Sequence, residues 1–88
     1  MTMYRKTHHV VFISKDNCHL CDEMWNELMK ASREVPLVVR TQTISEDKKV
    51  EYDRYRDKVP VLLINGSEVF RYRASAREII DALKKSDE

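Results

Sequence analysis

Apolar residues follow two kinds of pattern along this chain, short continuous runs and repeats with helical spacing. The order of these patterns predicts the secondary structure. Residues 10–14 and 59–64 are short runs rich in β-branched and aromatic side chains, which is typical of buried strands. The segment from residue 18 to about residue 34 instead repeats apolar residues at the spacing of one helix face. The repeat consists of Cys21, Met24, Trp25 and Leu28. A buried strand and an amphipathic helix are therefore predicted, joined by a short polar loop at 15–17.

The middle of the chain predicts a second strand and a second helix. Pro36 interrupts the first helical pattern, and a strand is expected from residue 37 to about residue 42. Residues 43–46, Thr-Ile-Ser-Glu, have the spacing of a capping box. A helix is expected to follow this box and to end near Arg56, although its apolar face is poor.

Turn and capping signals organise the remaining residues. Asn65-Gly66 predicts a hairpin that joins the strand at 59–64 to a strand at 68–73. Ser75 and Glu78 have capping-box spacing, and a last amphipathic helix should begin there. Its apolar face consists of Ala76, Ile79, Ile80 and Leu83.

The predicted element order is βαβαββα, an α/β fold. The first βαβ unit should be parallel and right-handed, and the hairpin should add antiparallel strands, giving a four-stranded mixed sheet. Because two strands are apolar without alternation, helices are expected on both faces of the sheet. A length of 88 residues predicts one domain, 1–88, with an ordered core from about residue 8 to residue 85 and a frayed tail at 86–88.

Charge and composition exclude several classes of function. The chain has 16 basic and 15 acidic residues, so nothing favours binding to nucleic acid or to a membrane. Its one glycine, Gly66, excludes glycine-rich phosphate loops. The first apolar run is short and follows Arg5 and Lys6 without a cleavage site, so no signal peptide and no transmembrane span are expected. We expect a cytoplasmic monomer.

Cys18 and Cys21 carry the candidate chemistry, and they are the only cysteines. A strand that delivers two thiols to the start of a helix is a dithiol redox geometry, because the helix N-terminus favours a thiolate. Two other interpretations stay open, an incidental pair and a metal site. Zinc needs four ligands, which His8, His9 or His19 would have to complete without a recognised spacing. His8 and His9 are expected to be exposed ahead of the first strand, and His19 to be exposed beside Cys18.

These motifs together resemble the thioredoxin fold in its minimal glutaredoxin form. The C-x-x-C pair after the first strand and Val59-Pro60 before the third are the shared features. The chain is most similar to small glutaredoxin-like proteins with the motif C-x-L-C-D-E, which here comprises Cys18, Leu20, Cys21, Asp22 and Glu23, followed by Tyr55 and by Val59, Pro60, Val61 and Leu62. The similarity extends from about residue 10 to residue 83.

The resemblance implies a role for each matching residue. Cys18 corresponds to the nucleophilic thiol and Cys21 to the resolving thiol. Pro60 corresponds to a proline that follows a cis peptide bond and faces the cysteines, and the Val59 backbone would pair with a peptide or glutathione. Lys15 corresponds to a lysine that meets a glutathione carboxylate.

Several positions depart from ordinary glutaredoxins. His19 and Leu20 replace Pro-Tyr between the cysteines, and Lys58 replaces the threonine before Val-Pro. The Gly-Gly pair and acidic residue that hold the γ-glutamyl end of glutathione are replaced by Phe70 and Arg71, followed by Tyr72, Arg73 and Ala74. Half of the glutathione site is therefore missing, and glutathione is expected to be a poor specific ligand.

The expected function is a glutaredoxin-like thiol–disulfide oxidoreductase. It would reduce protein or small-molecule disulfides by mixed-disulfide exchange, and an external thiol would regenerate it. No metal or organic cofactor is expected. The alternatives are a thioredoxin-fold adaptor with little turnover and a carrier of a metal or iron–sulfur cluster bound through the C-x-x-C pair.

Overall fold

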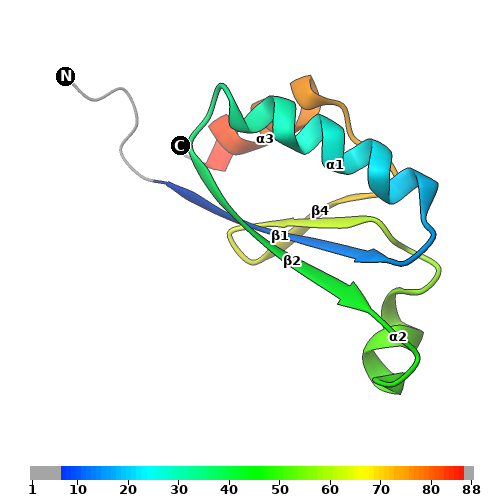
Figure 1. The fold of residues 1–88 in the computed structure, drawn as a ribbon. Helices are drawn as coiled ribbons and strands as arrows, with labels where there is room; N and C mark the ends of the chain where they lie inside the picture. The colour runs from blue at the N-terminus through cyan, green and yellow to red at the C-terminus, as the bar shows by residue number, and fades with distance from the viewer. Residues whose placement is uncertain (1–6, 87–88) are drawn as a thin grey trace.

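The computed structural model describes residues 7–86. The elements in chain order are β1 (His8–Lys15), α1 (His19–Ser32), β2 (Leu37–Ile44), α2 (Lys49–Tyr55), β3 (Val61–Ile64), β4 (Ser67–Arg71) and α3 (Ala76–Ser86) (Figure 1). The predicted order βαβαββα is confirmed. Ser86 is the last residue of α3, and the rest of the predicted frayed tail, 87–88, lies outside the described residues.

The strands form one mixed sheet in the order β2-β1-β3-β4. β1 pairs with β2 in parallel and with β3 antiparallel, and β3 pairs antiparallel with β4. The sheet is therefore the predicted four-stranded mixed one. The register aligns Ile13 with Val61, so the loop after β1 and the segment before β3 lie at the same end of the sheet.

Helices α1 and α3 lie side by side over one face of the sheet (Figure 1). The Phe12 ring in β1 packs on the Trp25 ring in α1, with centroids 5.3 Å apart. Buried residues of both helices, among them Leu28, Ile79 and Leu83, complete this core. Such packing removes apolar surface from water and provides the main stabilisation of the fold.

Helix α2 lies on the other side of the sheet, beyond the end of β2 (Figure 1). None of its residues is buried, and Val50 is 77% exposed. The poor apolar face that the sequence shows for this segment explains why α2 covers only one end of that face. Helices thus occupy both faces of the sheet, as predicted, but α1 and α3 cover their face more fully than α2 covers the other. Within residues 7–86, no helix is both long enough and apolar enough to span a bilayer.

Two predictions about local structure are wrong. Residues 43–46 do not cap α2, because Thr43 and Ile44 are the last residues of β2 and pair with Ser14 and Lys15 of β1. The helix begins later, after Lys48, which makes no side-chain capping hydrogen bond. His8 is not exposed ahead of β1. It is the first residue of β1 and is only 1% exposed, because strand alternation places it on the same face as Val10 and Phe12.

The hairpin and the last helix agree more closely with the predictions made from the sequence. Asn65 and Gly66 both have positive φ angles, as a tight hairpin turn requires. Strand β3 begins at Val61, so Val59 and Pro60 lie in the loop before it. Strand β4 ends at Arg71 because Tyr72 adopts a left-handed φ of 68°. The capping box of Ser75 and Glu78 is confirmed by two reciprocal backbone-to-side-chain hydrogen bonds of 2.9 and 3.1 Å.

Candidate functional site

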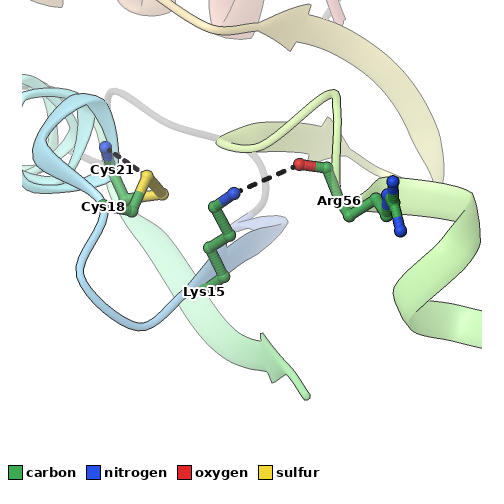
Figure 2. Close-up of a disulfide and its surroundings, with 4 residues drawn as sticks. All are labelled: Lys15, Cys18, Cys21 and Arg56. Atoms are coloured by element: carbon green, nitrogen blue, oxygen red, sulfur yellow. Dashed lines mark hydrogen bonds between the residues drawn. A yellow bond between two sulfur atoms is a disulfide. The ribbon is translucent and has the colours of Figure 1, made fainter. Parts of the chain in front are cut away.

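Cys18 and Cys21 form a disulfide at the N-terminus of α1 (Figure 2). Cys18 is the N-cap residue and has an extended backbone, and Cys21 lies in the first helical turn. The backbone N–H of Cys21 donates a hydrogen bond of 3.1 Å to the Cys18 Sγ atom. The Cys18 sulfur thus takes the place of the side-chain oxygen that usually caps a helix. The predicted meeting of both sulfurs at the first turn is confirmed.

The two cysteines differ in exposure. Cys18 is half-buried, whereas Cys21 is 4% exposed and begins the buried stripe of α1 with Met24 and Leu28. This difference follows from the helical spacing, because Cys21 shares the apolar face of α1 and Cys18 precedes the helix. A reactant that approaches from solvent therefore meets the Cys18 sulfur before the Cys21 sulfur.

His19 lies beside the disulfide on the outer surface of α1. Its side chain is 85% exposed, as predicted, and its Nε2 atom lies 2.9 Å from an oxygen of Glu23, one turn further along the helix. The contact orients the imidazole along the helix surface. Because both side chains are exposed, this pair contributes little to stability.

Lys15 links the strand before the motif to the end of α2. Its Nζ atom donates a hydrogen bond of 3.4 Å to the backbone carbonyl of Arg56. Figure 2 shows the Lys15 side chain extending from the end of β1 toward this carbonyl. The amine that the resemblance assigns to a glutathione carboxylate therefore already has a partner within the chain.

The Val59–Pro60 peptide bond is cis, as predicted. Both residues are buried. The Val59 N–H donates a hydrogen bond of 3.1 Å to the carbonyl of Tyr55, and the Pro60 carbonyl accepts one of 2.8 Å from the N–H of Tyr72. The sheet register places this segment at the same end of the molecule as Lys15. The predicted contact between Pro60 and the cysteine pair stays a prediction.

Arg71 is one of the residues that the resemblance places where ordinary glutaredoxins have Gly-Gly. Its Nε atom forms an ion pair and a hydrogen bond with Glu68. Both interactions raise the pKa of the Arg71 guanidinium, the hydrogen bond more strongly. Lys15, the Val59 N–H and Arg71, each expected near bound glutathione, are thus all engaged within the chain.

Tyr72 has a structural role in this region that sequence analysis missed. Its hydroxyl donates a hydrogen bond of 2.9 Å to the carbonyl of Asp57, while its own N–H bonds to Pro60. Tyr72 therefore ties the β4–α3 connection to the segment before β3 at two points. No sequence signal marks this, because both partners are backbone carbonyls distant along the chain.

Metal ligation lacks a geometric basis in the described part of the chain. Across residues 7–86, no three or more His, Cys, Asp or Glu side chains gather in an arrangement that could hold a metal ion. His8, one of the ligands considered from the sequence, is buried with its Nδ1 atom 3.2 Å from the Asn65 amide nitrogen. The two cysteines are instead joined to each other in a disulfide.

Comparison with solved structures places this fold among thioredoxins. Thioredoxin-2 of the malaria parasite, a component of its protein secretion machinery, is 21% identical over 90% of this chain and 82% of its own, with a TM-score of 0.59. A thioredoxin-like protein from Clostridium perfringens is 19% identical over 90% of this chain and 70% of its own, with a TM-score of 0.61. Thioredoxin f2 of Chlamydomonas reinhardtii is 25% identical over 93% of this chain and 82% of its own, with a TM-score of 0.54.

Family comparison is more specific than these structural likenesses. None of the curated proteins compared with this chain matches it. The model of the Glutaredoxin-like domain (DUF836) matches residues 9–84, which include both cysteines and the Val59–Pro60 segment. The chain therefore belongs to this glutaredoxin-like family of the thioredoxin fold.

Proposed function

We propose that this protein is a thiol–disulfide oxidoreductase that works through the Cys18/Cys21 dithiol. The observation that carries the proposal is the disulfide at the start of α1, with one half-buried and one fully buried cysteine. A bridge between residues three apart closes a very short loop, so it stabilises the fold little and fits a reversible role. Such a role belongs in a reducing compartment, and the cytoplasm is the proposed one.

The proposed reaction has two exchange steps. In the reduced protein, the Cys18 thiolate attacks one sulfur of a substrate disulfide, forms a mixed disulfide and expels the first substrate thiolate. The Cys21 thiolate then attacks the Cys18 sulfur, which closes the Cys18–Cys21 bridge and releases the second thiolate. The substrate gains two electrons and the dithiol loses them. An external thiol reductant restores the dithiol by the reverse exchange.

The geometry around Cys18 supports its role as the attacking sulfur. The Cys21 N–H that bonds to the Cys18 Sγ atom would also bond to a Cys18 thiolate, which favours the charged form. The positive end of the α1 dipole acts in the same direction. Both effects would lower the pKa of the Cys18 thiol relative to a free cysteine.

Lys15, Val59 and Pro60 are proposed to border the substrate, which is a protein or small-molecule disulfide. They lie at the same end of the sheet as the cysteines, as the register of β1 and β3 shows. Glutathione is the weaker candidate, because Lys15 and the Val59 N–H already bond to Arg56 and Tyr55. A ligand that used these groups would first have to break internal hydrogen bonds.

The test measures disulfide reduction by the purified protein with dithiothreitol as the terminal reductant and insulin as the substrate. We expect wild-type protein to accelerate insulin reduction and Cys18→Ser to abolish the acceleration. In a separate reaction, pre-reduced Cys21→Ser mixed with insulin after removal of dithiothreitol should accumulate a mixed disulfide on Cys18, visible as a mass increase. Equal rates for wild type and Cys18→Ser would overturn the proposal and favour an adaptor that does not turn over.

A further inference from the structure

A cavity of about 290 Å³ lies between the start of α1 and the sheet. Cys21, Asp22 and Trp25 line it from the helix, and Phe12 and four polar residues line it from β1 and β2. These polar residues are Ser14, Lys15, Thr41 and Thr43. The buried cysteine of the pair thus borders a space with both polar and aromatic walls rather than continuous apolar packing.

The register of the sheet explains why hydroxyls line this cavity. Ser14 pairs with Thr43, and Thr41 pairs with Phe12, whose ring contacts Trp25 of α1. These hydroxyls therefore share the sheet face that α1 covers. A cavity of this size with hydroxyl-bearing residues in its wall has room and partners for ordered water, since one water needs only about 10–15 Å³ of such volume. Water held there would connect the Cys21 sulfur with the other groups in the wall.

The second exchange step needs a group near Cys21 that can take its proton. In the mixed disulfide, Cys21 must lose its proton before it can attack Cys18, and burial disfavours a thiolate. The charged groups that line the cavity are Lys15 from β1 and Asp22 from α1, while β2 contributes hydroxyls. Lys15 is a cation whose amine is bonded to Arg56, so it cannot accept the proton. The carboxylate of Asp22 can.

We propose that Asp22 is the general base of the resolving step, an inference that rests on the proposed function. Asp22 takes the Cys21 proton through water in this cavity, and the Cys21 thiolate attacks the Cys18 sulfur. The S–S bond to the substrate breaks, the substrate thiolate leaves and takes a proton from solvent, and Asp22 returns its proton to solvent on its exposed side. Glu23, its neighbour, is the matched control because it lines a different hollow, between α1 and the β4–α3 connection.

The experiment follows reduced protein with 5,5′-dithiobis(2-nitrobenzoate) by stopped-flow absorbance, from about pH 5 to about pH 9. Attack by Cys18 releases the first coloured thiolate, and attack by Cys21 releases the second, so the two steps appear as two phases. We expect Asp22→Asn to slow the second phase by roughly 10²-fold at neutral pH and to make it rise with hydroxide. Asp22→Glu should retain most of the rate, and Glu23→Gln should follow wild type in the second phase.

The direction of the rate change in Asp22→Asn distinguishes a general base from a carboxylate that acts only through its charge. If Asp22 acted only through its charge, its removal would favour a Cys21 thiolate and accelerate the second phase. An unchanged or faster second phase in Asp22→Asn therefore overturns the inference. Loss of the first phase in wild-type protein would instead refute disulfide exchange by Cys18, the proposed function itself. Circular dichroism of each variant checks that the exposed substitution leaves the fold intact.

Discussion

The Oε1 atom of Glu27 in α1 accepts a hydrogen bond of 2.8 Å from the backbone N–H of Ala76, the first residue of α3. Such an N-terminal N–H has no partner within its own helix, so Glu27 satisfies it from a neighbouring helix. The other Glu27 oxygen lies 2.9 Å from the Lys30 amine. The Lys30 hydrogen bond, and after it the Ala76 N–H, lower the pKa of the Glu27 carboxyl.

This contact predicts a pH-dependent contribution of Glu27 to stability. A carboxyl with a lower pKa in the folded state stabilises the fold above its unfolded-state pKa, and this stabilisation is lost as the pH falls through the folded-state pKa. Glu27→Gln should therefore unfold at lower urea than wild type at neutral pH, and the difference should shrink below about pH 4. Urea midpoints across pH measure this, with exposed Glu46→Gln as the control. A difference in urea midpoint between Glu27→Gln and wild type that stays constant with pH would contradict this prediction.

Tyr72→Phe should loosen the segment before β3. The substitution removes the hydroxyl that bonds to the Asp57 carbonyl, and one such bond contributes about 0.5–1.5 kcal/mol to the free energy of unfolding. We also expect faster hydrogen exchange at the Val59 amide, whose bond to Tyr55 lies in the same segment. Tyr52→Phe, which removes the hydroxyl of a half-buried ring in α2, is the matched control. Unchanged exchange at Val59 would show that Tyr72 does not hold this segment.

The two thiols should differ in acidity once the disulfide is reduced. Cys18 caps α1 and accepts the Cys21 N–H, whereas Cys21 is buried. In single-cysteine variants, iodoacetamide should therefore modify Cys18 in Cys21→Ser faster, and at lower pH, than Cys21 in Cys18→Ser. Rates of alkylation across a pH series, followed by mass spectrometry, measure this. A faster and more acidic Cys21 would reverse the assigned roles.

Reduced glutathione should bind more weakly to this protein than to an ordinary glutaredoxin. No acidic residue stands among Tyr72, Arg73 and Ala74 to meet its amine, and Arg71 is paired with Glu68. A lost charge-assisted contact costs about 1.5–3 kcal/mol, which is roughly tenfold to over a hundredfold in affinity. A titration followed by amide chemical shifts near Lys15, Val59 and Arg71 measures the affinity. Tight saturation with shifts at all three positions would make glutathione the leading substrate.

The sequence by itself determined the elements whose signals are local. The apolar run at 10–14, the stripe from Cys21 to Leu28, the Asn65-Gly66 turn and the Ser75–Glu78 capping box each predicted a feature that the structure contains. Each depends on side-chain periodicity or on bonds between residues within one turn. The difference in exposure between Cys18 and Cys21 followed from the same periodicity.

Only the tertiary structure decided the features that depend on pairing between distant segments. Pairing with β1 extends β2 through Ile44, against the capping signal at 43–46, because a continuous ladder and burial of Ile44 outweigh a local cap. The same pairing buries His8. The Tyr72 hydrogen bonds and the cavity beside Cys21 join groups from separate elements. No local pattern encodes them, because a backbone carbonyl or a cavity wall acquires its partners only when the chain has folded.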